Sequence, residues 1–335
     1  MFYRCGSCGS NMVYNFNKGT LECLNCGNME QPELLPAAAD GNCPNCGAPL
    51  DPGPYEIAGK CPFCGTYHVY EEKAVGEHAP VRIIPTTLTR VEAFRLLQKE
   101  YSRYVALVPE IFSDKRLNEV QTEYIPYWVF SYRVRMGYTG DLKERIFRGS
   151  DTIIKTRRIS FSFEAVLNDV PKDASDRMPD DIMDAVEPFQ FKTAREFRPE
   201  YLSGARAEYF NHPSEQYRKD AYAKMREKAE DLFCRKLLAA YPHGDLSESR
   251  IRSGMQLEVV SETCEFDLLP VYIYEYATES GRKFTYYING QTEEIYGSVP
   301  VSRLRMALGC AAAGALFLGA AGVVNLILVL LGGAL

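Results

Sequence analysis

The residues best suited to chemistry are eight cysteines near the N-terminus, which form four Cys-x-x-Cys pairs. Fourteen residues separate the two pairs of each set, and every cysteine of the first set recurs 38 positions later in the second. This spacing indicates an internal duplication of one small module. The four pairs are Cys5/Cys8, Cys23/Cys26, Cys43/Cys46 and Cys61/Cys64.

Cysteines at this spacing are typical of a metal site. Two residues between cysteines let both thiolates of a knuckle reach one ion, and two knuckles complete a tetrahedral site with Zn–S distances of about 2.3 Å. A glycine follows the second cysteine of every pair, and a tight knuckle favours glycine because the backbone there is left-handed. We therefore predict two zinc ribbons, each with one structural Zn2+, whose binding supplies most of the folding free energy of the first 80 residues.

Other uses of the cysteines fit the sequence less well. No signal peptide is recognisable, which disfavours disulfides. A thioredoxin-type motif needs one pair between a strand and a helix, whereas here four pairs lie in glycine-rich segments. His68, four residues after Cys64, is a candidate replacement ligand, but eight cysteines already complete two sites.

The predicted metal module is acidic. The chain carries a net charge of -6, and residues 1–80 hold four basic against nine acidic side chains, a balance of -5. A protein that grips nucleic acid normally places a basic surface on its binding module. The charge therefore disfavours nucleic-acid binding by the ribbons.

The last thirty residues, 306–335, contain no charged side chain. Roughly 20 apolar residues span a bilayer as a helix, so this segment predicts one transmembrane helix. Arg303 and Arg305 precede it and no basic residue follows, which predicts a single-pass protein of the cell membrane with its N-terminal domains in the cytoplasm. A helical hairpin turning near residues 319–322 is the alternative, although arms under about 15 residues are too short to cross. Small residues at every fourth position would let such helices associate into oligomers.

The chain between these ends predicts an α+β fold. We expect ribbons over 1–30 and 40–71, a linker over 72–80 and a cytoplasmic domain over 81–302, followed by the transmembrane segment. Thr89 and Glu92 form a capping box at the start of a helix. Strands are expected after Pro126 and over 153–163, 255–266, 268–277 and 283–289, with helices over 179–186 and 214–241 and a tight turn at Asn289-Gly290. Strand runs with helices between them are typical of a mixed, mainly antiparallel sheet.

The combination resembles a family of bacterial membrane proteins with paired N-terminal ribbons, called transcription factor IIB-type zinc ribbon proteins and sometimes labelled primosomal protein N' or helicase-like. The resemblance rests on the eight cysteines, the terminal apolar segment and two internal stretches, Tyr-Ile-Pro-Tyr-Trp-Val-Phe from Tyr124 and Tyr-Ile-Asn-Gly-Gln-Thr from Tyr287. It implies a cytoplasm-facing scaffold, linked to membrane-stress assemblies. A motor's Gly-x-x-x-x-Gly-Lys-Ser/Thr string is absent from the sequence, so we expect no helicase activity.

No catalytic machinery is recognisable. The chain has four histidines, no Gly-x-Ser-x-Gly elbow and no zinc-protease helix motif, so we expect that it is not an enzyme. Residues 131–160, in contrast, hold eight basic against three acidic side chains, which makes this segment the candidate for contact with an anionic surface. The eight are Arg133, Arg135, Lys143, Arg145, Arg148, Lys155, Arg157 and Arg158.

These observations predict a membrane-tethered cytoplasmic adaptor whose ribbons dock an unidentified protein partner. The alternative is a ribbon protein that binds anionic lipid or nucleic acid through residues 131–160, of which lipid is favoured because membrane anchoring brings basic residues near the headgroups. A third interpretation of the basic segment is the solvated face of a β-hairpin.

Overall fold

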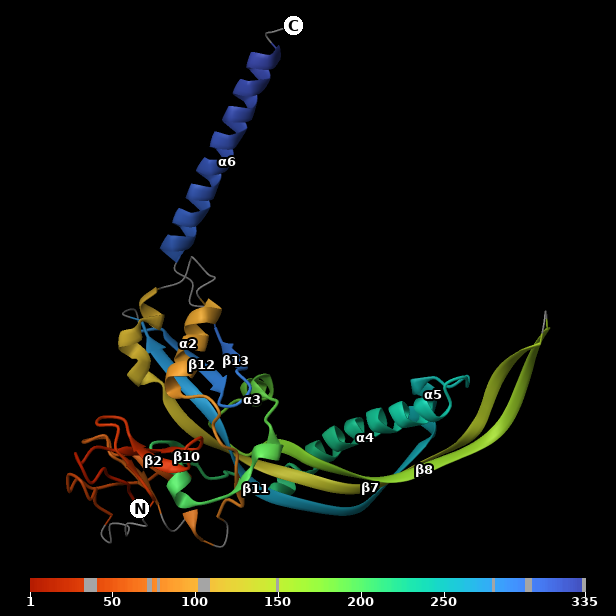
Figure 1. The fold of residues 1–335 in the computed structure, drawn as a ribbon, viewed down its shortest axis with the longest axis horizontal. Helices are drawn as coiled ribbons and strands as arrows, with labels where there is room; N and C mark the ends of the chain where they lie inside the picture. The colour runs from red at the N-terminus through yellow and green to blue at the C-terminus, as the bar shows by residue number, and fades with distance from the viewer. Residues whose placement is uncertain are drawn as a thin grey trace. The chain divides into compact units, whose positions relative to one another are not determined.

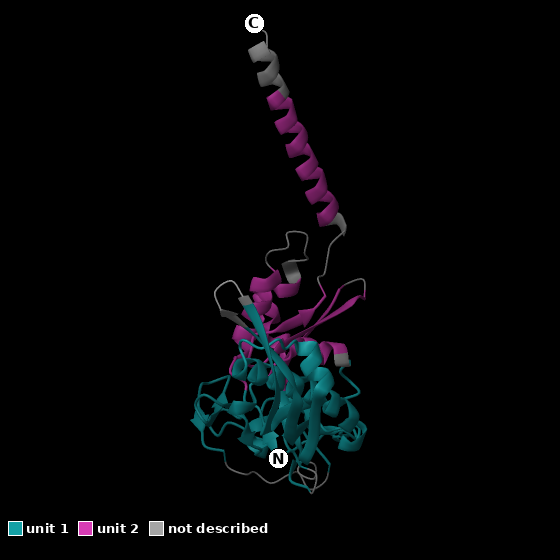
Figure 2. Cartoon of the chain, turned by 90° about the vertical axis from the view of Figure 1, so that its right-hand side faces the viewer, with its two compact units in different colours: residues 1–85, 124–180, 190–269 teal, residues 86–123, 181–189, 270–335 magenta. Residues whose placement is uncertain are grey.

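The computed structural model describes residues 1–32, 41–70, 74–76, 79–101, 109–148, 151–278, 281–298 and 303–332. The chain forms two compact units, each assembled from separate stretches of sequence (Figure 2). Unit 1 contains residues 1–85, 124–180 and 190–269, and unit 2 contains residues 86–123, 181–189 and 270–335. Residues 33–39 of the predicted link between the ribbons, residues 40 and 71 of the predicted second ribbon, and residues 72–73 and 77–78 of the predicted linker lie outside the described residues.

The two cysteine modules of unit 1 are built from short antiparallel strands. In the first, β1 (Met12–Asn15), β2 (Thr20–Cys23) and β3 (Met29–Glu30) form their own three-stranded sheet. In the second, β4 (Glu56–Lys60) pairs with β5 (Tyr67–Val69), and β4 also pairs with β10 (Arg206–Glu208). The second module is therefore part of the main sheet of unit 1, whereas the first module forms a separate sheet.

The main sheet of unit 1 runs in the order β11-β7-β10-β4-β5. Most of β7 (Gln121–Arg148) pairs with β8 (Asp151–Asp173) in a long antiparallel hairpin, from Tyr127 opposite Asp173 to Arg148 opposite Asp151. Strand β11 (Met255–Ala277) contributes residues 255–269 to unit 1 and residues 270–277 to unit 2. The predicted strands at 255–266 and 268–277 are thus one continuous strand.

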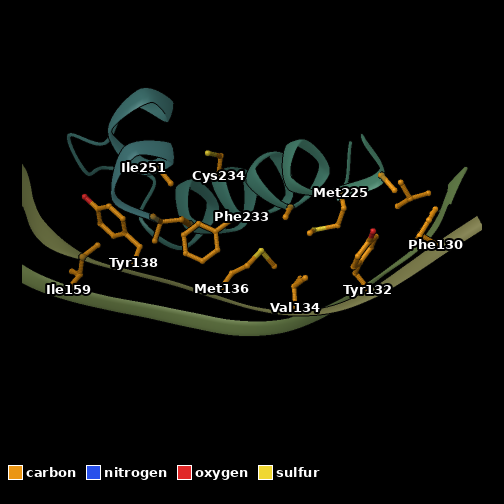
Figure 3. Packing of buried hydrophobic residues seen from close by; sticks show 14 of the residues in the cluster. Phe130, Tyr132, Val134, Met136, Tyr138, Ile159, Met225, Phe233, Cys234 and Ile251 are labelled. Carbon is orange, nitrogen blue, oxygen red and sulfur yellow. The ribbon is translucent and has the colours of Figure 1, made fainter. Parts of the chain in front are cut away.

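Helix α4 (Arg218–Ala240) lies along the hairpin, as Figure 1 shows, and α5 (Glu248–Gly254) precedes β11. Every second residue of β7 faces α4, so Val134, Met136 and Tyr138 are buried while Arg133 and Arg135, at the alternate positions, are exposed. On α4, residues four apart such as Phe233 and Leu237 are buried in the same cluster. Figure 3 shows Phe233 of this helix pointing toward the strands of the hairpin. The predicted helix over 214–241 is confirmed, except that residues 214–216 form a 3-10 turn before α4 begins.

A short strand, β6 (Arg82–Ile83), joins β11 in parallel and also pairs with β9 (Arg195–Glu196). Its Arg82 donates through Nη2 to Asp267 on β11 over 2.6 Å, and Asp267 has no exposed surface. This pair explains why β11 does not break at Asp267, because the arginine satisfies the buried carboxylate and the strand can continue through it.

Unit 2 packs α2 (Arg90–Tyr101) near the end of β11 together with β12 (Lys283–Asn289) and β13 (Ile295–Gly297). The predicted capping box is present, since the Thr89 amide donates to Glu92 Oε2 over 2.7 Å and the Glu92 amide donates to Thr89 Oγ1 over 3.3 Å. The predicted turn at Asn289-Gly290 is longer than two residues, because the connection between the strands spans 290–294 and the Asn289 side chain accepts from the Gln291 amide.

The described residues also form helix α3 (Asp180–Val186), as predicted, and helix α6 (Arg303–Gly332). Helix α6 runs without interruption through residues 319–322, so the helical-hairpin alternative is not what the structure forms. Its residues Arg305–Val324 are long and apolar enough to cross a membrane, with a mean hydropathy of 2.0 and none of this stretch buried. The predicted α+β class, with two cysteine modules at the front and one apolar helix at the end, is confirmed.

Candidate metal centres and the basic hairpin

The four cysteines of each module converge, as the spacing predicts. In both groups the four sulfurs lie within 4.8 Å of one another. Neighbouring sulfurs are 3.5 Å apart between Cys8 and Cys23 and 3.6 Å apart between Cys5 and Cys26. A regular tetrahedron of 2.3 Å bonds has edges of about 3.8 Å, so these sulfurs fit one tetrahedral ion of zinc's dimensions. The second module gives the same fit, with 3.5 Å between Cys43 and Cys64 and 3.8 Å between Cys46 and Cys61.

All four knuckles use the same backbone hydrogen bonds. In the first, the Gly9 amide donates to the Cys5 carbonyl over 2.8 Å and the Cys5 amide donates to the Ser10 carbonyl over 2.9 Å. The other three repeat both bonds at the equivalent positions. The glycines have φ between 72° and 75°, which confirms that each knuckle needs the left-handed backbone that only glycine adopts at little cost. These glycines are Gly9, Gly27, Gly47 and Gly65.

Each cluster contains thiols whose pKa is lowered and thiols whose pKa is raised. The Ser10 side chain hydrogen-bonds to the Cys8 sulfur and lowers the pKa of that thiol to about 5. The Asn28 amide favours ionisation of Cys26. The hydrogen bonds of the Cys26 thiol with the other three sulfurs outweigh this effect and raise the pKa of Cys26 to about 12. Neighbouring thiolates repel each other, so a cluster without a cation cannot ionise fully. A divalent ion removes that penalty, and the chemistry of the donor set therefore suits a bound metal.

The second cluster shows the same division. Burial raises the pKa of Cys64, but hydrogen bonds with the Thr66 side chain and amide outweigh it and bring the pKa to about 5. Cys46 has its pKa raised to about 12, because burial and the neighbouring sulfurs outweigh a hydrogen bond from the Ala48 amide. Four thiolates would fill the coordination shell of the ion in either site, which leaves no open position for a substrate.

Side chains around the sulfurs differ between the two sites. In the first, Asn28 and Asn25 donate to the sulfurs of Cys5 and Cys8 over 3.7 and 3.6 Å. In the second, Nε2 of the buried His68 lies 3.4 Å from the Cys43 sulfur. His68 is therefore a hydrogen-bonding neighbour of a ligand and not a replacement ligand. Because His68 follows Cys64 by only four residues, the sequence indicated that it lies near the second cysteine cluster. The spacing alone did not show whether it would bind the metal or contact a cysteine.

Replacing His68 tests this contact. Burial lowers the pKa of His68, so at neutral pH the ring is uncharged and carries one N–H, which the Nε2–H tautomer would donate to the Cys43 sulfur. We expect His68→Phe to weaken metal binding at the second site about tenfold or more, because hydrogen bonds to ligands typically contribute that much. Competition with a chromogenic chelator measures the affinity. His68→Gln, which keeps a donor, should recover most of it, and equal loss in both variants would contradict the assignment.

The structure divides the eight basic residues of the hairpin. Side chains of β7 at odd positions and of β8 at even positions share the face of the hairpin opposite α4. Arg133, Arg135, Lys143, Arg145 and Arg158 lie on this exposed face. Lys155 and Arg157 lie on the other face, and the side chain of Arg148 is outside the described residues.

Two of these basic residues are already paired. Arg135 contacts Glu164 at 2.7 Å and Glu258 at 2.9 Å, and Arg157 contacts Glu144 at 2.8 Å while lying over the Tyr241 ring. Glu164 and Glu258 come from outside residues 131–160, so a count of charges within the segment overstates its free positive charge. The paired arginines support the interpretation as a solvated strand face for the part of the hairpin beside α4.

Two exposed apolar side chains, for which the sequence raised no expectation, lie in the knuckles. Leu24 is 66% exposed between Cys23 and Cys26, and Phe63 is 71% exposed between Cys61 and Cys64. The sequence could have indicated their exposure, because the residues between the two cysteines of a Cys-x-x-Cys pair point away from the small ribbon core. Each module therefore presents one large apolar residue from its second knuckle.

Comparison with known proteins adds one relative. The chain is 27% identical over 326 residues to the uncharacterized protein YdjG of Bacillus subtilis, and the match covers 91% of this chain and 92% of that protein. No protein-family model matches the chain. No solved structure matches it either.

Proposed function

We propose that this protein is a membrane-tethered adaptor whose two zinc ribbons dock a protein partner in the cytoplasm. The observation that carries the proposal is the exposure of Leu24 and Phe63 on knuckles that a closed cluster of four thiolates would hold rigid. Exposed apolar residues on a rigid backbone are suitable anchors for a partner, since little backbone freedom is lost on binding.

The chemistry of the clusters supports a structural metal and not a catalytic one. Four cysteine sulfurs at tetrahedral spacing favour Zn2+, and a coordination shell completed by protein leaves no position for substrate. We therefore propose two structural zinc ions and no enzymatic activity. The same features support the proposed kinship with bacterial membrane-anchored double zinc-ribbon proteins of the transcription factor IIB type.

The apolar helix supports the tether. Residues Arg305–Val324 satisfy the length and composition of a membrane span, and Arg305 lies at its N-terminal end. The positive-inside bias then favours a cytoplasmic location for units 1 and 2 in the cell membrane. Association of α6 helices through their small residues would give oligomers.

A matched pair of surface variants tests the docking role. Leu24→Ser combined with Phe63→Ser should reduce capture of the partner from detergent-solubilised membranes by at least tenfold, because truncated anchors typically cost about 2 kcal/mol or more, about thirtyfold. Val75, 61% exposed but outside the cysteine knuckles, provides the control, and Val75→Ser should capture as the wild type does. Metal content should stay at two ions in both variants. Equal recovery by all three proteins would rule out docking through the knuckles.

Nucleic-acid binding through residues 131–160 is the second candidate. The exposed basic residues of the hairpin favour it, and the ion pairs of Arg135 and Arg157 weaken it. Raising salt from about 50 to 200 mM distinguishes the two functions. A fall in affinity of roughly a thousandfold or more indicates phosphate contacts, whereas a docked protein held by apolar anchors should be retained.

A further inference from the structure

The far end of the β7–β8 hairpin continues beyond its hydrophobic core. The register between the strands is unbroken from Leu142 opposite Arg157 to Arg148 opposite Asp151. The last buried core residues are Leu142 on β7 and Ile159 on β8. Beyond these two, every side chain that the structure describes is at least partly exposed. Residues 244 and 245 still pair with β7 at Glu144 and Lys143, and past Glu144 the end is a two-stranded ribbon.

Two isoleucines are exposed on this bare end. Ile153 is 45% exposed and Ile154 is 61% exposed. Because they are consecutive on a strand, they lie on opposite faces of the ribbon. Neither belongs to the core cluster under α4 or packs against it. A strand with one solvent-facing side alternates polar and apolar residues, so one residue of two consecutive ones should be polar. Two consecutive exposed isoleucines therefore need another explanation.

Basic side chains surround the isoleucines. Arg145 is the cross-strand neighbour of Ile154, and Lys143 and Arg158 lie on the same face. Lys155 follows Ile154 on the opposite face. Within the described part of the chain, no ion pair joins any of these four side chains to a carboxylate, in contrast to Arg135 and Arg157. Three acids lie in this part of the hairpin: Asp141 is opposite Arg158 in register, Asp151 is opposite Arg148, and Glu144 is opposite Lys155 and forms its ion pair with Arg157.

We propose that the end of this hairpin binds an anionic membrane surface. The four basic side chains would contact lipid phosphates, and Ile153 and Ile154 would enter the interfacial layer beneath them. Basic residues with adjacent apolar ones are the composition of such surfaces, and each basic residue strengthens binding about fivefold. The inference rests on the proposed membrane tether but not on the docking role of the ribbons.

The isoleucines favour lipid over nucleic acid as the binding partner. A basic β-ribbon can also enter a DNA groove, where its cations would contact the phosphates. A DNA-binding ribbon can insert an apolar side chain between base steps, but from the face that meets the groove, whereas an interfacial layer accommodates isoleucines from both faces. Nucleic acid is therefore the alternative outcome of the test.

A single tryptophan reports the contact directly. The chain has one tryptophan, Trp128, so Trp128→Phe combined with Ile154→Trp places the only indole at the hairpin end. The full-length protein is reconstituted in nanodiscs of phosphatidylcholine with or without phosphatidylglycerol, with brominated acyl chains as quencher. We expect quenching and a blue-shifted emission in the anionic discs and neither in the neutral ones. Trp128→Phe with Val260→Trp, on the exposed face of β11 at 43% exposure, should be quenched in neither.

Charge variants in the Ile154→Trp protein test the role of the basic residues. Arg145→Gln should weaken the contact about fivefold, whereas Arg135→Gln, the same charge change on the same face at a paired arginine, should leave it unchanged. Replacing Lys143, Arg145 and Arg158 together by glutamine should weaken it about a hundredfold. The proposal is overturned if the protein with Ile154→Trp is quenched no more in anionic discs than the protein with Val260→Trp. It is also overturned if duplex DNA, and not anionic lipid, changes the emission. Partner capture by the ribbons is measured separately, so either idea can fail alone.

Discussion

Replacing Cys43 and Cys46 by serine should disrupt more of unit 1 than replacing Cys5 and Cys8. Strand β4 of the second ribbon pairs with β10, with Ala58 opposite Ala207, and Ile57 is fully buried in a core with residues from β7 and β11. Metal binding to such modules contributes on the order of 10 kcal/mol or more to folding. Loss of the second ion should therefore release β4 and β5 and expose the β10 edge of the main sheet.

Hydrogen exchange with metal analysis measures this asymmetry. Each double variant should retain one ion per chain instead of two. In the Cys43→Ser/Cys46→Ser protein we expect faster exchange in β4, β5 and β10, whereas in the Cys5→Ser/Cys8→Ser protein the faster exchange should stay mainly in β1–β3, which form their own sheet. Equal loss of protection at β10 in the two variants would show that the second ribbon does not support the sheet.

Removing residues 306–335 should transfer the protein from the membrane fraction to the soluble fraction. Residues Arg305–Val324 form an apolar helix in which no residue is buried, and an exposed apolar surface of this length is stable only in lipid. We expect the full chain to remain membrane-bound after alkaline carbonate extraction and the truncated chain to be released almost completely.

A replacement helix separates hydrophobicity from sequence. A leucine and alanine segment of the same length should restore membrane binding, because a span depends on apolar length more than on particular residues. Protease protection of the intact chain in sealed vesicles then reports its orientation. If the truncated chain stays in the membrane fraction, either the anchor lies elsewhere or the hairpin end binds lipid strongly by itself.

The parts that could be predicted from the sequence depend on contacts between near neighbours. The Cys-x-x-Cys spacing and its glycines determined the knuckles, and the Thr89–Glu92 box marked the start of α2 because its partners are three residues apart. Helix α4 was recognisable since its buried residues recur at helical spacing. In each case the residues that determine the structure lie within one or two turns of chain.

The parts that could not be predicted depend on partners far away in the chain. Asp267 suggested a break between two strands, but Arg82, 185 positions away, neutralises it in the fold. Nothing near β4 indicates that it pairs with β10 near residue 207. The composition of the basic segment gives no sign of its longest-range ion pair, because Glu258, which pairs with Arg135, lies 123 residues further along. Sequence spacing carries no information on such contacts.

The interleaving of the two units affects how the chain can be cut and how it is made. Neither unit is a contiguous segment, so a fragment that begins after residue 80 lacks the ribbon strand that covers β10 and leaves a bare sheet edge prone to aggregation. During synthesis the ribbons can bind metal early, but β4 must wait for β10 to emerge well over a hundred residues later. Unit 2 gains its last strands, β12 and β13, only when synthesis has passed residue 297, directly before the apolar helix α6.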